Sequence, residues 1–378
     1  MNSSLIFALD APQYHLLRRD APNRFSGFVF DYLAKPVKGI NVYRDHQFVE
    51  SFRADLASDD IHQYVAHIPA TRNCRFAFDL HVDSRVVLYS LEIVYEDNSI
   101  GEVIPYSVSE VIAKQDWFDT LNARLKDIPT PPADLVYATQ GIHDVLAYQN
   151  SIIPGVDNMR SYLIKSGVEL KRINSILDLG CGTGRLLVGW YLDNPRRRLF
   201  GCDLNPVLID WAGKNLPAAM HFHRNDLQPP LPYENEQFEF VYLVSVFTHL
   251  SLDTQKRWMN EIERILAPRG ILLITFHGDI YLQLAQSSKL AEFQRREYLE
   301  IVDRNEDEGT NNYAAYHGLG FVRELFHAFD LIGYFPRGNA EGKVLFPVAA
   351  FQDVYVLRKA GNPVASAEAV PPSPAREN

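Results

Sequence analysis

The spacing of apolar and polar residues divides the chain into two parts. Between residues 25 and 108, apolar side chains alternate with polar ones in short runs separated by turn residues, as in residues 74–82. Alternation with a period of two is typical of strands that bury one face, and about six to eight such strands fit into this length. We therefore expect residues 1–128 to form an all-β sandwich.

A proline-rich stretch follows this region. Prolines occupy positions 129, 131 and 132, and neither a helix nor a strand ladder accommodates that spacing. Residues 129–134 are therefore predicted to be a linker between two domains. Residues 361–378 are rich in Pro, Ala and Ser, which predicts a disordered tail.

Strand-like and helical runs alternate between residues 135 and 360. Such alternation predicts an α/β domain with a doubly wound, Rossmann-like parallel sheet that has helices on both faces. Ser251 is a suitable N-cap for one of these helices, and residues 320–334 and 351–357 suggest a closing hairpin. The expected strands are 175–179, 198–202, 220–224, 239–244 and 271–276, and the expected helices are 135–150, 157–170, 185–192, 206–215 and 252–266.

Composition and charge narrow the possible partners. The chain has 47% apolar and 22% charged residues, as an ordinary folded protein does, and its net charge of −10 opposes partners bound through their phosphates. We therefore expect no nucleic-acid partner. No apolar run reaches the roughly 20 residues that span a bilayer, and no secretory signal is evident. The three cysteines lack metal-site or disulfide spacing, so we expect a cytoplasmic protein.

The most informative segment is a strand that runs through a glycine-rich loop into a helix. Glycine allows a sharp turn and the close approach of a ligand, and the first amides of the next helix favour negative groups. A dinucleotide fingerprint would need its third glycine where Arg185 stands, so the pattern here is GxGxG instead of GxGxxG. The loop consists of Gly180, Cys181, Gly182, Thr183 and Gly184.

An acid before the first glycine indicates which ligand the loop binds. Asp178 would repel the pyrophosphate of a dinucleotide, but it suits a cationic group. S-adenosyl-L-methionine brings a sulfonium and an ammonium to one end of such a loop. Asp178 therefore favours S-adenosyl-L-methionine as the cofactor.

Two further acids stand at the ends of the following strands. Asp203 can accept hydrogen bonds from both ribose hydroxyls, and Asp226 can accept one from the adenine amino group. Leu204 and Leu227 can cover the faces of the adenine ring. The alternative interpretation is that both acids only cap the next helix.

Together these residues resemble the class I S-adenosylmethionine-dependent methyltransferases over about residues 175–276. The resemblance implies a seven-stranded sheet, with Asp178 and the glycines at the methionine moiety, Asp203 at the ribose and Asp226 at the adenine. Residues 244–250 and 271–278 are similar to methyltransferases of bacterial polysaccharide and glycosyltransferase loci. We therefore expect a sugar or glycan hydroxyl, or another small hydroxylated molecule, as the acceptor.

Methyl transfer to a hydroxyl is an in-line displacement that also needs a base. His249, after the fourth strand, is the candidate catalytic base, because histidine accepts protons near neutral pH. Ser245, on the same segment, is a candidate on the cofactor side, whereas His277, Tyr313 and His317 are candidates for acceptor binding. For each of these four ring side chains, a purely structural hydrogen bond is the alternative. No acid lies between residues 241 and 252, so we expect no metal.

Three functions remain open at this point. The first is O-methyl transfer to a sugar or glycan hydroxyl. The second is a non-catalytic protein that retains the cofactor fold as a binding scaffold, and the third is methyl transfer to a protein or small-molecule amine. The β-sandwich could bind glycan, act as a scaffold or form a homo-oligomer.

Overall fold

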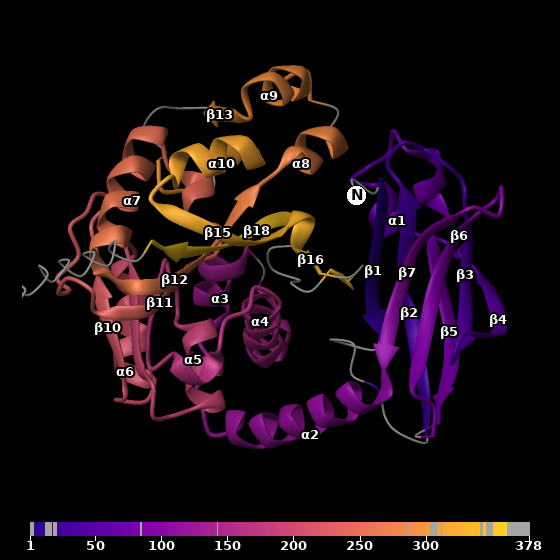
Figure 1. Cartoon of the computed structure of the whole chain (residues 1–378), viewed down its shortest axis with the longest axis horizontal. Helices are drawn as coiled ribbons and strands as arrows, with labels where there is room; N and C mark the ends of the chain where they lie inside the picture. The colour runs from indigo at the N-terminus through magenta and orange to yellow at the C-terminus, as the bar shows by residue number, and fades with distance from the viewer. Residues whose placement is uncertain are drawn as a thin grey trace, which may run out of the picture.

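The computed structural model describes residues 4–11, 17, 21–83, 85–141, 143–285, 287–302, 308–310, 312–340, 343–344 and 351–360. The predicted tail, 361–378, lies outside these residues. Two β-rich parts lie side by side, and a long helix, α2 (Val108–Leu125), passes between them along one edge (Figure 1).

The N-terminal β region consists of two antiparallel sheets with one shared core. Phe25 and Phe76 from one sheet and Ile40 and Leu91 from the other belong to the same buried cluster. Strands such as β5 bury alternate residues, as the sequence pattern predicts. One sheet has the order β1 (Leu5–Ala11), β2 (Ala21–Asp31), β5 (Arg75–Val82), and the other has the order β4 (Gln47–Arg53), β3 (Val37–Arg44), β6 (Leu88–Tyr95), β7 (Ile100–Ser107).

Short helices and α2 complete this half of the chain. Helix α1 (Asp59–His62) and the 3-10 helix η2 (Pro69–Arg72) precede β5. The sequence analysis did not predict α2. Its Trp117 donates to the Asp193 carboxylate, with 3.2 Å between Nε1 and Oδ1, and Asp193 also pairs with Arg160 and Arg197. These contacts attach α2 to the second part of the molecule.

The second part is an α/β domain built on a mixed sheet. Its strands lie in the order β10-β9-β8-β11-β12-β18-β15; the first five are parallel, whereas β18 runs antiparallel to both of its neighbours. These strands are β8 (Ser175–Leu179), β9 (Arg198–Asp203), β10 (Met220–Arg224), β11 (Phe238–Leu243), β12 (Leu266–His277), β15 (Phe329–Phe335) and β18 (Gln352–Lys359).

The resemblance implied seven strands, but this sheet has nine among the described residues. The extra two, β13 (Tyr298–Val302) and β14 (Tyr313–His317), form a hairpin that joins the end of β12 through the pair His277 and Tyr316. The seven-stranded count was therefore too low, because this hairpin extends the sheet beyond β12. The short strands β16 (Asn339–Ala340) and β17 (Lys343–Val344) pair with each other elsewhere.

Helices cover both faces of the sheet. Tyr242 and Leu273 point into one buried cluster with helices α4 and α5, whereas their neighbours Val241 and Leu272 point into another with α7 and α10. Buried side chains on both faces are what a doubly wound sheet requires. The remaining helices are α3 (Ala133–Gln140), α4 (Val145–Lys165), α5 (Arg185–Asp193), α6 (Pro206–Asn215), α7 (Leu252–Ile265), α8 (Asp279–Leu284), α9 (Leu290–Arg296) and α10 (Leu319–Leu325), with 3-10 helices η3 (Leu170–Arg172), η4 (Phe247–His249) and η5 (Pro336–Gly338).

Several sequence predictions can be checked directly. Ser251 caps α7 by accepting a hydrogen bond from the Thr254 amide, as predicted. Cys74, Cys181 and Cys202 are buried free thiols. Among the helices of the described ranges, none is both long and apolar enough to cross a membrane.

Candidate functional site

The glycine loop leaves β8 at the carboxyl edge of the sheet and leads into α5. Gly180, Gly182 and Gly184 have φ values of +82°, +54° and +78°, a region that side chains with a Cβ rarely adopt. A Cβ on Gly180 would lie 2.4 Å from Val246 Cγ2, and one on Gly182 would lie 2.7 Å from Thr139 Cγ2. The alternating glycines are therefore needed for both the turn and the close packing of the loop.

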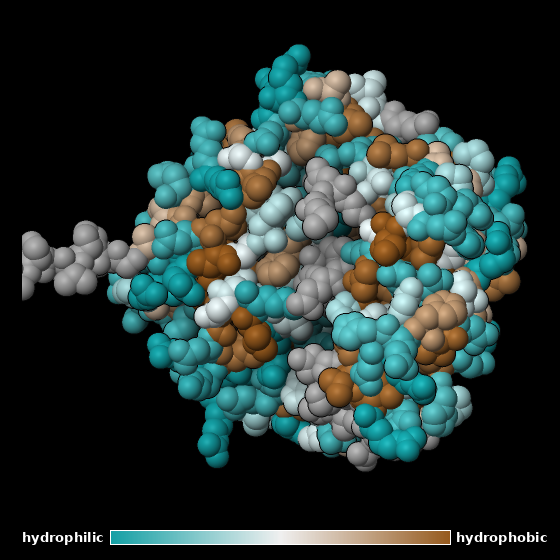
Figure 2. Space-filling model, turned by 45° about the vertical axis from the view of Figure 1, so that its right-hand side comes forward, coloured by the Kyte–Doolittle hydropathy of each residue, from teal (hydrophilic) through white to brown (hydrophobic). Residues whose placement is uncertain are grey.

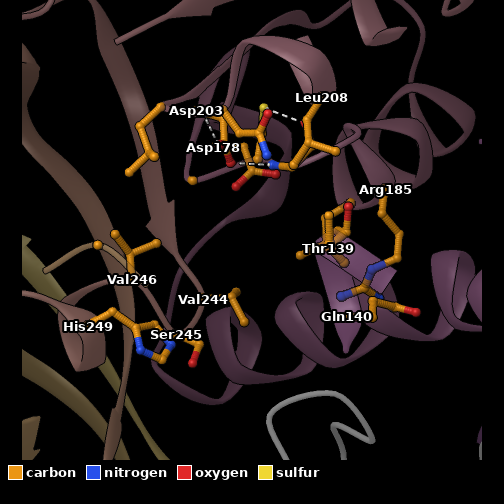
Figure 3. Close-up of a pocket in the computed structure, with 18 of the residues that line it drawn as sticks. Thr139, Gln140, Asp178, Arg185, Asp203, Leu208, Val244, Ser245, Val246 and His249 are labelled. Carbon is orange, nitrogen blue, oxygen red and sulfur yellow. Dashed lines mark hydrogen bonds between the residues drawn. The ribbon is translucent and has the colours of Figure 1, made fainter. Parts of the chain in front are cut away.

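A cavity of about 550 Å³ opens beside this loop. In Figure 3, Asp178 and Asp203 lie together at one end, and His249 lies across the cavity from Arg185. The cavity therefore brings together the glycine loop and the ends of three parallel strands. Its lining includes Thr139, Gln140, Asp178, Gly180, Cys181, Gly182, Arg185, Asp203, Leu204, Ser245, Val246 and His249.

Asp178 is a buried acid in the wall of this cavity. The residue is 3% exposed, and its Oδ2 accepts a hydrogen bond of 3.0 Å from the Tyr242 hydroxyl. Burial raises the pKa of Asp178 to about 8, although the Tyr242 hydrogen bond and the nearby Arg185 charge oppose the shift. A cation beside this carboxylate would favour its charged form.

Asp203 stands at the end of β9 and organises the loop. Its two carboxylate oxygens accept from the amides of Gly182 and Asn205, each at 2.8 Å. Burial raises the pKa of Asp203, and these backbone hydrogen bonds oppose the shift. The side chain thus contributes to the turn geometry and also lines the cavity.

Asp226 and Leu227 lie next to the main cavity in a smaller hollow of about 50 Å³. Leu204 and Trp258 line the same hollow. The Trp258 indole donates to the Leu227 carbonyl, with an N···O distance of 2.9 Å, which fixes the segment that carries Asp226. The structure therefore places the acid and the two leucines of the sequence analysis in one small, largely apolar hollow.

His249 is held in a defined orientation. Its Nδ1 lies 2.9 Å from the Tyr313 carbonyl oxygen. A carbonyl can only accept, so Nδ1 carries the proton and Nε2 is the acceptor in the neutral ring. Burial lowers the pKa of His249 below its usual value, and backbone hydrogen bonds to Tyr313 and Thr310 oppose the shift. The neutral form therefore predominates near pH 7.

Ser245, at the cavity wall, has a strained backbone with φ = +60°. Its amide donates to Thr275 Oγ1 at 2.8 Å, and its Oγ accepts from Gln352 Nε2 at 2.8 Å. Thr275 in turn donates to Gln352 Oε1. Strands β12 and β18 therefore hold this conformation in place.

The three residues predicted to bind the acceptor have different surroundings. The His277 ring centroid lies 6.3 Å from that of His249, close to the cavity. The Tyr313 hydroxyl instead donates to Glu300 Oε2 at 2.6 Å, so its carbonyl is the part that touches the site. His317 is fully buried, and its Nε2 bonds to Gln255 Oε1. Among the described residues none of these three lines the cavity itself, and His277 is the one whose ring contacts the lining residue His249.

The sequence analysis missed several lining residues. Thr139 and Gln140 come from α3, which precedes the loop by some forty residues in the sequence and carries no recognisable motif. Arg185 is 4% exposed, and its Nη1 donates to Ser151 Oγ at 3.1 Å. Its place directly after the glycine loop was a usable signal.

Within the described residues, no group of three His, Cys, Asp or Glu side chains is arranged to hold a metal.

These residues fit S-adenosylmethionine. The glycine loop has no room for a Cβ against Val246 and Thr139 of the cavity wall, and a buried carboxylate beside it is suited to a cation. Asp203 and Asp226 stand beside the loop at successive strand ends, where a nucleoside could lie along the sheet edge.

Parts of the chain are similar to known methyltransferases. A family model described as a methyltransferase domain matches residues 177–274. A tRNA N(3)-cytidine methyltransferase from Gallus gallus is 27% identical over 112 residues, which cover 27% of this chain and 30% of that protein. A malonyl-[acyl-carrier protein] O-methyltransferase from Halalkalibacterium halodurans is 27% identical over 132 residues, covering 34% of this chain and 47% of that protein.

The chain thus spans roughly a third to a half of the length of the curated relatives it matches. Among solved structures, a TehB-like SAM-dependent methyltransferase from Corynebacterium glutamicum is 21% identical, with a TM-score of 0.40, and the alignment covers 61% of this chain and all of that one. The family match identifies residues 177–274 as a methyltransferase domain, and S-adenosylmethionine is its cofactor.

Proposed function

We propose that the whole chain transfers a methyl group from S-adenosylmethionine to a hydroxyl group, and that this hydroxyl belongs to a sugar or glycan. One observation carries the choice of a hydroxyl. A neutral histidine, His249, lines the same cavity as Asp178 and the glycine loop, and its Nδ1 is held by a carbonyl. Such a histidine is suited to take a proton at Nε2.

The residues of the chain have separate tasks in binding the cofactor. When bound, S-adenosylmethionine supplies an electrophilic methyl group on a positively charged sulfur. Asp178 stabilises the positive end of the cofactor, whereas the buried Arg185 guanidinium is placed to attract its carboxylate. Asp203 accepts from the ribose, and Asp226 accepts from the adenine.

His249 has its task on the acceptor side. Its Nε2 would take the proton of the hydroxyl as the methyl–oxygen bond forms and the methyl–sulfur bond breaks, which would leave a methyl ether and a neutral thioether; such general-base catalysis contributes about 10²–10⁴-fold in rate. Because Nδ1–H stays bonded to the Tyr313 carbonyl, the developing positive charge on the ring is stabilised where it forms. We propose metal-independent transfer, since the described acids and histidines form no ligand cluster.

The surroundings of His249 support an uncharged acceptor. The ring of His277 contacts that of His249, and Tyr281 and Tyr316 flank His277 at centroid distances of 4.5 and 5.5 Å. Burial lowers the pKa of His277 to about 4, so it is neutral near pH 7. The similarity to methyltransferases of polysaccharide loci adds the preference for a sugar, whereas the named relatives act on acceptors of several different kinds.

Two experiments test this proposal. Calorimetric titration of the full chain with S-adenosylmethionine separates an enzyme from a binding scaffold, since no detectable heat at millimolar cofactor would leave only the scaffold. Transfer of labelled methyl to nucleotide sugars, oligosaccharides, nucleic acids and amines then identifies the acceptor. We expect label on a sugar hydroxyl, and label found only on amines or RNA would overturn the choice of acceptor. Light scattering in solution separately tests the alternative that the β region forms a homo-oligomer.

A further inference from the structure

The N-terminal β region meets the methyltransferase domain at the helix that follows β12. Ile280, in α8, is 1% exposed and belongs to a buried cluster with Ile6, Phe30 and Ile68 of the N-terminal β region. Helix α8 lies on the side of the domain that faces β1 (Figure 1). On the face drawn in Figure 2, apolar residues lie in separate patches. The apolar residues of this junction instead form one buried cluster.

A chain of ring contacts leads from this junction to the catalytic cavity. Tyr281 packs against the junction cluster, and its ring centroid lies 4.5 Å from that of His277. His277 lies edge-on to His249 at 6.3 Å. The His277 Nδ1 is buried and has no hydrogen-bond partner among the residues that the structure describes. Packing against Tyr281 and Tyr316 therefore fixes the ring without help from that atom.

A second, polar connection runs parallel to the first. Arg337 donates from Nη2 to the Tyr32 hydroxyl at 3.0 Å, and its guanidinium lies 5.1 Å from the centre of the Tyr32 ring. The Arg337 amide donates to Asp353 Oδ1 at 2.7 Å. Asp353 follows Gln352, whose side chain donates to Ser245 in the cavity wall. Tyr32 is thus connected through β18 to the strained turn after β11.

We propose that the N-terminal β region positions the acceptor side of the catalytic cavity. Two positioning residues carry this contact: Ile280, in α8, anchors that helix and the ring stack that includes His277, and Tyr32, in the N-terminal β region, holds Arg337 of η5, just after β15. In this role the N-terminal β region is a fixed part of the enzyme. If the region were instead an independent glycan-binding module joined only through residues 129–134, it would not need these contacts. This inference rests on the proposed function, since it takes the side of the cavity near His249 and His277 to receive the acceptor.

Two variants and one control test the inference in the full chain. Ile280→Ala removes the apolar anchor, and Tyr32→Phe removes only the hydroxyl that accepts from Arg337. Ile173→Ala is the matched control, because Ile173 is 4% exposed and lies before β8, at the opposite edge of the sheet from the cavity. The readouts are hydrogen exchange of residues 279–284 and 245–249, carbethoxylation of His277 by diethyl pyrocarbonate, and the affinity for S-adenosylmethionine.

We expect Ile280→Ala to speed both exchange and His277 modification by roughly tenfold over Ile173→Ala, with a smaller rise for Tyr32→Phe. Cofactor affinity should stay within about threefold of wild type, because the glycine loop and its acids do not touch the junction. Equal rates in Ile280→Ala and Ile173→Ala would overturn the inference, and so would unchanged rates in Tyr32→Phe if Ile280→Ala fails to fold. A wild-type chain that binds no cofactor would instead refute the proposed function.

Discussion

Two buried carboxylates, one in each part of the molecule, show how differently the parts use charge. Asp31, in the N-terminal β region, is 1% exposed and accepts hydrogen bonds from Ser4, Tyr95 and the Leu33 amide at 2.5 to 2.8 Å. Asp178, in the methyltransferase domain, is 3% exposed, and the side chain that donates to it within the described residues is Tyr242.

We interpret the contrast as one between a structural acid and an acid that, under the proposed function, binds a ligand. Leaving a buried charge short of donors costs free energy, whereas saturating it with donors fixes the fold around it. Asp31 ties the end of β2 to β6 through Tyr95, and its donors come from the chain itself. Burial raises the pKa of Asp178, and the side-chain donor that the described residues supply to it is Tyr242. Under the proposed function, a cationic ligand completes its surroundings.

The largest effect should come from His249, a group outside this pair. We expect His249→Ala to lower the turnover number by about 10²–10⁴-fold and to leave cofactor affinity within about threefold, because only proton removal is lost. Methyl-transfer kinetics and calorimetry measure the two quantities. His81→Ala, an exposed histidine in β5, is the control and should change neither. Normal turnover in His249→Ala would show that another group is the base.

The two acids can then be exchanged for amides in parallel. Asp178→Asn should weaken S-adenosylmethionine binding by roughly ten- to a hundredfold, because one interaction with a charged group contributes about that much affinity. The same substitution should not lower thermal stability. Asp31→Asn should lower the melting temperature and leave cofactor affinity unchanged. Calorimetry and thermal denaturation check both. If Asp178→Asn only destabilised the fold, the two acids would be alike and the comparison would fail.

The pH dependence sharpens the same comparison. Because burial raises the pKa of Asp178 to about 8, this carboxyl is mostly protonated at pH 7 in the free protein. Cofactor affinity should therefore increase as pH rises towards about 8, by up to about tenfold per unit, and level off above it. Calorimetry of wild type and Asp178→Asn at each pH removes the titration of the cofactor itself. Equal pH profiles for the two proteins would contradict this assignment.

The same shift affects stability. The native state keeps a proton on Asp178 that the unfolded chain, with a carboxyl pKa of about 3.9, has lost. This group's contribution to stability is therefore fully present below pH 4 and declines as pH rises from about 4 to about 8. Saturating cofactor should offset the decline. Asp178→Asn should lack this component in urea denaturation across that range.

The smallest effect concerns the backbone of the site. Gly182→Ala forces an alanine to φ = +54° and pushes its Cβ against Thr139, so we expect about 1–2 kcal/mol of destabilisation and a melting temperature lower by about 3–6 °C. Gly213→Ala is the control, since a Cβ there meets nothing within 4 Å in helix α6. It should be neutral or slightly stabilising. Equal melting temperatures for the two variants would show that the loop tolerates side chains.

Local patterns predicted the central part of the fold closely. Strands β8 and β10 and helix α6 have the predicted boundaries. Elsewhere packing overrode local signals. The predicted helices 135–150 and 157–170 leave a gap near Pro154, but α4 runs through this proline because Ile152, Ile153 and Val156 are all buried against the domain core.

The cavity wall that we propose to bind the cofactor could be assembled from the sequence because its residues follow one another along the chain. The loop Gly180–Gly184 and the acids Asp178 and Asp203 lie on two consecutive strands. The acceptor side could not be predicted in the same way. His277, Tyr281 and Tyr316 come from separate elements, and Ile280 shares a buried cluster with Ile6, which lies far earlier in the chain. Apart from the spacing of four residues between His277 and Tyr281, no local pattern encodes these contacts.

By itself, the sequence determined the α/β class, the glycine loop and the acids that follow successive parallel strands, because periodicity and strand-end chemistry are local properties. Only the tertiary structure decided which tautomer His249 adopts, what surrounds the candidate acceptor residues and which helix the N-terminal β region covers. Those properties depend on burial and on partners distant in sequence, such as the Tyr313 carbonyl for His249.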